Sequence, residues 1–179
     1  MTLADLDPDA VAQDAERRVV DHLHRLALDV GAEVHAEATL GTLRAEARAL
    51  TLYAQRGLPV WDWTDSGMAS AGLLSVLAAL YSRAADADLD RTAIDVVDDL
   101  DPSDDLGLVL VAAAARIRLD QDVPVTAREL GALVGLTAVR VRQLVAAGEL
   151  RATDERPQRV PAEDARRWLA SRGVPGFGR

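Results

Sequence analysis

The stretch Val125–Leu150, VTARELGALVGLTAVRVRQLVAAGEL, contains two short amphipathic patterns separated by a glycine turn. Thr126 and Glu129 have the spacing of a capping box, in which hydroxyl and carboxylate each satisfy a backbone amide of the first helical turn. Gly135 can adopt the left-handed conformation that a sharp turn requires, and Thr137 is placed to cap the second helix. This spacing predicts two short helices joined by a tight turn.

The apolar residues of both predicted helices recur at helical spacing and are expected to form a shared core: Leu130, Leu133, Val134, Val141, Leu144 and Val145. The second helix is predicted over 138–147, ahead of Gly148, and it carries a different set outward: Val139, Arg140, Arg142 and Gln143. Arginine can pair bidentately with guanine and glutamine with adenine, so this face has groups able to read bases.

Two short extended pieces, 149–152 and 158–160, flank a polar turn and predict a small two-stranded wing. From Pro161 onward, PAEDARRWLASRG predicts a third helix, with proline in the first turn and carboxylates where the helix dipole favours them. Trp168 and Leu169 are expected to close the small core.

The segment from about Val123 to Arg172 resembles the winged helix-turn-helix of the MerR and excisionase DNA-binding proteins. The resemblance is carried by TARELGALVGLTAVRVRQLVAAGEL, the wing and VPAEDARRWLA. In that group the second helix enters the major groove, and the wing reaches a flanking groove or phosphates. MerR regulators carry this unit at the N-terminus, whereas here it lies at the C-terminal end of the chain.

The resemblance implies a bacterial or phage protein that binds duplex DNA at the nucleoid, as a transcriptional regulator or an excisionase-like accessory factor. Carried over position by position, it assigns DNA contacts to nine residues: Arg128, Thr137, Val139, Arg140, Arg142, Gln143, Arg151, Arg156 and Arg159. Winged helices also bind proteins. The alternative is therefore an interaction adaptor, such as an antitoxin-like or phage assembly factor.

The charge of the chain is unevenly distributed. The whole sequence of 179 residues has a net charge of −9. The residues from Val123 onward include ten arginines and six acids, a net charge of +4. The preceding 122 residues include ten arginines and 23 acids, a net charge of −13. This asymmetry predicts two parts with different partners, a basic part that binds phosphates and an acidic part that DNA repels.

Residues 1–120 are predicted to form an acidic bundle of five helices, so the expected fold is mainly all-α. After a loose arm at 1–7, helical patterns run over about 9–30, 34–56, 68–81, 91–100 and 106–117. The run LGLVLV at 106–111 also suits a buried strand, but nearby partner strands are lacking, which favours a helix. Ser103 or Asp104 is expected to cap it, and Trp61 or Trp63 to pack against the bundle.

The joining segment RLDQDVP, 118–124, is predicted to be a hinge, and residues 173–179 a flexible tail. One small winged unit contacts few base pairs, so binding by a single copy should be weak. The sequence therefore favours a homodimer through the N-terminal helical domain, which would present two half-sites.

Several other function classes find no support in the residues. There is no cysteine, and His22 and His24 are two apart, so they point in different directions on a helix and no metal is expected. Neither a phosphate loop nor a nucleophile motif occurs, so we expect neither an enzyme nor a cofactor. The apolar runs are too short for a membrane span, and no signal peptide is expected at the N-terminus. We therefore expect a cytoplasmic protein.

Overall fold

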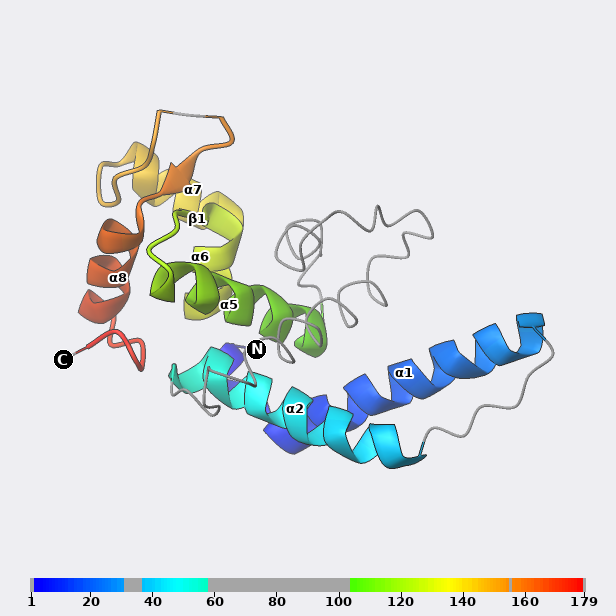
Figure 1. Cartoon of the computed structure of the whole chain (residues 1–179). Coiled ribbons are helices and arrows are strands. Elements are labelled where there is room, and N and C mark those ends of the chain that lie inside the picture. The colour runs from blue at the N-terminus through cyan, green and yellow to red at the C-terminus, as the bar shows by residue number, and fades with distance from the viewer. Residues whose placement is uncertain (1, 31–36, 58–103, 155, 179) are drawn as a thin grey trace.

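A computed structural model of the chain describes residues 2–30, 37–57, 104–154 and 156–178. Over these residues the protein is mainly helical, with a small antiparallel sheet of two strands, which confirms the expected mainly all-α class (Figure 1). The helices expected at 68–81 and 91–100, and the packing expected for Trp61 or Trp63, lie outside the described residues.

The N-terminal helices α1 (Pro8–Val30) and α2 (Glu37–Arg56) form an antiparallel pair (Figure 1). Their bounds agree with the sequence pattern, since α1 ends just before Gly31 and α2 just before Gly57. Small side chains such as Ala12 and Ala15 of α1, and Ala47 of α2, are buried, and they let the two helices approach closely.

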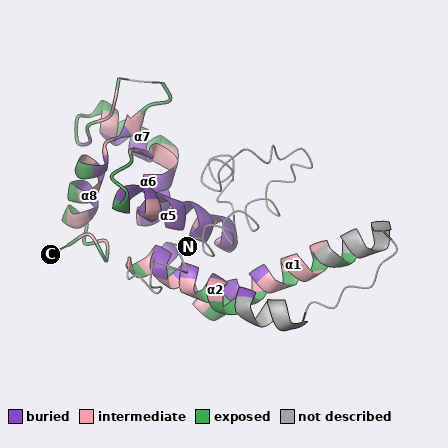
Figure 2. Ribbon diagram, viewed as in Figure 1, coloured by how far each residue is buried: buried purple, intermediate pink, exposed green. Residues whose placement is uncertain are grey.

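Helix α5 (Asp105–Asp120) lies at the centre of the described structure. The preference for a helix over a strand here is confirmed, and Asp104 caps the helix by accepting a hydrogen bond of 2.9 Å from the Gly107 amide. All seven residues from Val109 to Ala115 are fully buried, because α2 packs on one side of α5 while α6 and α8 pack on another (Figure 2). A helix apolar on nearly all sides can be stable only in such surroundings.

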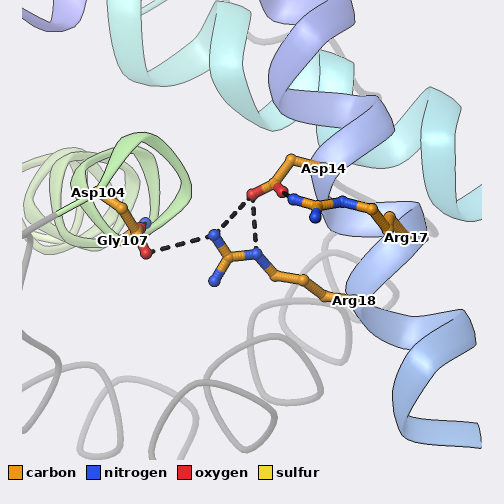
Figure 3. A network of polar contacts seen from close by, with 5 residues as sticks. All are labelled: Asp14, Arg17, Arg18, Asp104 and Gly107. Atoms are coloured by element: carbon orange, nitrogen blue, oxygen red, sulfur yellow. Dashed lines mark hydrogen bonds and ion pairs between the residues drawn. The ribbon is translucent and has the colours of Figure 1, made fainter.

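An ion-pair network joins α1 to the start of α5 (Figure 3). Arg18 donates from Nε to Asp14 over 2.8 Å and from Nη2 to Asp104 over 3.3 Å. Arg17 pairs with the other oxygen of Asp14. Arg18 therefore links α1 to the residue that caps α5.

The C-terminal part consists of β1 (Val125–Thr126), α6 (Ala127–Val134), α7 (Ala138–Ala146), β2 (Arg159–Val160) and α8 (Ala162–Ser171). The three predicted helices are present, and their core is the expected one: Leu130, Leu133, Val141, Leu144, Trp168 and Leu169 are buried, with Val134 and Val145 half-buried. Pro161 occupies the N-cap position of α8.

The wing differs from the prediction. Strand β2 pairs antiparallel with β1, with Val160 opposite Val125, and residues 149–152 are not a strand. The loop ahead of β2 is closed by two hydrogen bonds between Thr153 and Arg159. The Thr153 amide donates to the Arg159 carbonyl over 2.7 Å, and the Thr153 hydroxyl accepts from the Arg159 amide over 3.2 Å. The prediction of a strand over 149–152 is wrong because the stretch ahead of α6 supplies the partner of β2.

The N-terminal arm is packed rather than loose. Its short 3₁₀ helix η1 (Leu3–Asp5) buries Leu3, and Leu6 follows it into the core. The side-chain amide of Gln55 donates to the carbonyls of both, over 3.0 and 2.8 Å. Two buried leucines bring this arm against α2, α5 and α6, which the acidic composition of residues 1–7 did not indicate.

Two residues of the C-terminal tail, the segment 173–179 predicted to be flexible, contact the body. Arg116 of α5 donates from Nη2 to the Pro175 carbonyl over 2.9 Å and lies 4.7 Å from the centre of the Phe177 ring. Its Nε donates to the Ala54 carbonyl over 2.6 Å. Burial lowers the pKa of Arg116 to about 10, against the raising effect of Tyr53 and Asp120, which leaves it charged at neutral pH.

The segment expected to be a hinge, 118–124, starts inside α5. Arg118 is buried there and pairs with Glu129 of α6, with Nη1 and Oε1 2.7 Å apart. A buried, paired arginine holds its two helices in a fixed relation. Helix α5 therefore packs against both parts of the chain, the helical domain expected to end at 120 and the unit expected to begin at 123.

Candidate nucleic-acid interface

The turn between α6 and α7 is set by residues that the sequence identifies. Gly135 has φ +68°, the left-handed conformation expected for it, and Thr137 caps α7 by accepting from the Arg140 amide over 3.2 Å. A Cβ atom on Gly131 would lie 2.3 Å from the Leu136 carbonyl oxygen, so the backbone after the turn passes directly over α6. Two glycines four residues apart therefore make this close packing possible.

Helix α7 presents an exposed face beyond this turn. Thr137, Val139, Arg140, Arg142 and Gln143 are all exposed, and the side chain of Val139 is the most exposed large apolar one in the described residues, at 58%. Arg140 donates from Nη1 to the Gln143 Oε1 over 3.2 Å. The outward face predicted for the second helix is confirmed in its composition.

Three of the nominated arginines line one cleft. Arg128 comes from α6, Arg142 from α7 and Arg159 from β2, and the cleft has a volume of about 410 Å³. The other lining residues are Thr126, Ala127, Val145, Ala152, Pro157, Gln158 and Val160. Among the residues that the structure describes, those lining the cleft are neutral or basic, and three arginine side chains reach it beside α7.

The remaining nominated arginines lie elsewhere. Arg151 lines a separate hollow, with Glu149, Asp164, Arg167 and Trp168 among its neighbours, so the surface around it has mixed charge. Arg156 is exposed on the loop before Pro157 but does not line the cleft. The structure thus gathers Arg128, Arg142 and Arg159 and separates these two from them.

The orientation of α6, and with it one wall of the cleft, depends on Glu129. This buried carboxylate accepts from the Thr126 amide over 2.7 Å through Oε2, and its Oε1 pairs with Arg118 of α5. The capping box predicted from the sequence is confirmed, but its second role, as an anchor to α5, is new. In the sequence, this anchor was indicated only by an arginine within the alanine-rich α5. The sequence could not show which acidic residue pairs with that arginine.

Two other kinds of site receive no support from the described structure. Within the described ranges, no three histidine, aspartate or glutamate side chains gather where they could hold a metal ion. None of the described helices has both the length and the apolar character that crossing a membrane requires.

Comparison of the chain with protein-family models, with curated proteins and with solved structures gives no match.

Proposed function

We propose that this chain is a sequence-specific double-stranded DNA-binding protein whose residues 123–172 act as a winged helix-turn-helix. The observation that carries the proposal is the exposed face of α7 lying beside a cleft lined by Arg128, Arg142 and Arg159. In this proposal α7 enters the major groove, and the loop 153–159 serves as the wing. We propose that such binding serves either the regulation of transcription or an excisionase-like accessory activity.

The chemistry of α7 suits base recognition. Arg140 and Gln143 project from the same exposed face, one turn apart, and they have the bidentate groups that match guanine and adenine edges. Val139 offers an apolar contact of the kind that the thymine methyl group takes. Contact with the edge of a base pair would therefore explain why an apolar side chain is exposed among polar ones.

The position of α1 and α2 is compatible with the same orientation. Helices α1 and α2 reach the rest of the chain mainly through α5, and they lie on the side of the molecule away from α7 (Figure 1). Helices α1 and α2 therefore leave the exposed face of α7 open to an approaching duplex (Figure 1).

Dimerisation is part of the proposal, because one small winged unit neutralises few phosphates and should bind weakly alone. The N-terminal helical domain is the place where a second copy would attach, away from α7. A dimer would bind two half-sites about one helical turn apart. Light scattering that shows only monomer at high protein concentration would contradict this part.

The test is selection from a random duplex library by the full-length protein at two salt concentrations, followed by sequencing of the bound DNA. We expect one enriched motif, and a palindromic motif if the protein binds as a dimer. Recovery of unenriched DNA that is lost as salt rises would show attraction to phosphates alone and would refute sequence-specific reading. Absence of DNA binding at both salts would favour the protein-interaction adaptor.

A further inference from the structure

We propose that Arg140 and Gln143 form one unit that reads a guanine, in which Arg140 contacts the base and Gln143 holds the Arg140 guanidinium in position. This inference rests on the proposed function and deepens it, because it names the base that this part of α7 recognises. It also removes Gln143 from the role of an independent adenine reader, to which its amide side chain alone would assign it.

The first argument is the direction of the hydrogen bond between the two side chains. Arg140 donates from Nη1 to Gln143 Oε1 over 3.2 Å. A guanidinium group has five N–H donors and no acceptor, so it can bond the amide of Gln143 only through the amide oxygen. The acceptor of Gln143 is therefore turned toward a positive charge.

The second argument compares this arrangement with the base edges in the major groove. Glutamine reads adenine when its oxygen accepts from the N6 amino group while its NH2 group donates to N7. An amino group that approached Oε1 of Gln143 would meet the Arg140 guanidinium, which also carries only donors. Guanine presents two acceptors, O6 and N7, and so it suits a pair of side chains whose outward groups are donors.

The third argument is the geometry of Arg140. The bond to Gln143 starts at Nη1, so it does not use the edge formed by Nε and Nη2, which has two parallel N–H groups. Two such groups match O6 and N7 of guanine. Arg140 also lies in the first turn of α7, and in helix-turn-helix proteins the N-terminal residues of the second helix contact base edges.

The fourth argument concerns the cost of ordering an exposed arginine. Arg140 is exposed, and contact with a base removes much of the rotamer freedom of so long a side chain. A partner that already holds the guanidinium in the free protein reduces this loss. Thr137 likewise holds the backbone of Arg140 by accepting from its amide over 3.2 Å. Gln143 thus acts as a positioning residue, which favours guanine contact by Arg140.

The experiment measures binding of the full-length protein to duplexes in which each base pair of the motif recovered by selection is changed in turn to the other three. The proteins are wild type, Arg140→Ala, Gln143→Met, Gln143→Glu and the double variant Arg140→Ala with Gln143→Met. Glutamate keeps an acceptor for Arg140 but lacks the NH2 donor, whereas methionine lacks both groups of the amide. Gln121→Glu is the matched control, because it makes the same charge change at an exposed position at the C-terminal end of α5.

We expect Arg140→Ala to abolish the preference for guanine at one position, where wild type favours guanine by about tenfold or more. Gln143→Met should lower the preference at the same position by about threefold or more, and the double variant should behave like Arg140→Ala alone. Gln143→Glu should keep the preference for guanine, although its negative charge weakens binding to every duplex. Gln121→Glu should leave every preference within about twofold of wild type. Thermal unfolding of each variant checks that folding is unchanged.

The inference is overturned if Gln143→Met removes a preference for adenine, or if Gln143→Glu replaces it by a preference for cytosine, because Gln143 would then read a base itself. It is also overturned if Arg140→Ala acts at a base other than guanine, or if the effects of Arg140→Ala and Gln143→Met fall at different positions or add in the double variant. In these cases the motif remains and sequence-specific binding stands. If wild-type protein enriches no motif, sequence-specific reading fails and the inference fails with it.

Discussion

At the scale of single residues, the pair of Arg118 and Glu129 decides how α6 is held. Both side chains are nearly inaccessible, at 5% and 1%, and the carboxylate also accepts from the Thr126 amide. A buried ion pair adds little net stability compared with apolar packing, but removal of one partner leaves the other charge uncompensated. The pair therefore makes one position of α6 against α5 much more favourable than the others.

Glu129→Ala is expected to lower the free energy of unfolding by about 3–5 kcal/mol, because it breaks the buried ion pair with Arg118. Chemical denaturation at neutral pH measures the loss. Glu163→Ala is the control, since Glu163 pairs with Arg167 at the surface with 82% of its side chain exposed. Such a pair is worth at most about 1 kcal/mol, and equal losses in the two variants would contradict the account.

The Asp14 network predicts a dependence of stability on pH. Partial burial raises the pKa of the Asp14 carboxyl, but hydrogen bonds and charges from Arg18 and Arg17 outweigh burial and lower the pKa below its usual 3.8. Folding then favours the charged carboxylate. Its contribution is therefore present above the usual pKa and is lost as pH falls through the lowered one.

Asp14→Asn should accordingly reduce stability at neutral pH by up to about 1 kcal/mol, since the pair is partly solvated. The difference from wild type should shrink as the pH falls below about 4. Urea denaturation over this range of pH measures it, with Asp154→Asn at an exposed loop position as the control. A difference that stays constant down to acid pH would show that the carboxylate charge contributes nothing.

At the scale of elements, the turn between α6 and α7 depends on Gly135 and on the N-terminal arm. A Cβ atom on Gly135 would lie 3.0 Å from the Thr2 methyl carbon, in addition to the strain of φ +68°. The arm therefore packs against the same turn that orients α7.

Gly135→Ala is expected to cost about 1–2 kcal/mol for the left-handed backbone, with a further cost from contact with Thr2. Thr2→Ser removes the methyl group but keeps the hydroxyl that bonds Asp5. In the Thr2→Ser background the cost of Gly135→Ala should fall to the backbone part alone, as measured by thermal unfolding. An unchanged cost would show that the arm does not rest on the turn.

The elements that the sequence predicts well are those whose signals are local. Thr126, Glu129, Gly135 and Thr137 specify helix ends through bonds within four residues, and the structure has those bonds. Strand β1 comes before α6 and α7 in the sequence and β2 comes after them, so their pairing is not local. Strands of only two residues also lack an alternation of apolar and polar residues that the sequence could reveal. The burial of Arg116 and Arg118 likewise depends on partners distant in the sequence.

At the scale of the whole molecule, α5 belongs equally to the N-terminal helices and to the C-terminal unit. It packs against α2 with one part of its surface and against α6, α8 and β1 with another. Composition and charge placed a boundary between 120 and 123, where the chain turns from acidic to basic. The charge difference reflects mainly surface residues, however. The apolar core continues across that boundary through α5.

A fragment of residues 123–178 is therefore expected to lack a cooperative thermal transition, because it loses the helix on which α6 and α8 pack. A fragment of residues 104–178 keeps α5 and the Arg118–Glu129 pair, and it should retain more helix and a measurable transition. Circular dichroism on heating compares the two. Cooperative unfolding of the shorter fragment would show that the C-terminal unit folds without α5.

The most direct test of DNA reading by α7 is the difference in binding free energy between the selected duplex and one with a single changed base pair. Wild-type protein should discriminate by about 1–3 kcal/mol at a pair contacted bidentately, and Arg140→Ala should abolish the discrimination at one such pair. Arg48→Ala, on the exposed side of α2, should preserve it. Equal binding of both duplexes by wild type, or full discrimination by Arg140→Ala at every pair, would contradict the account.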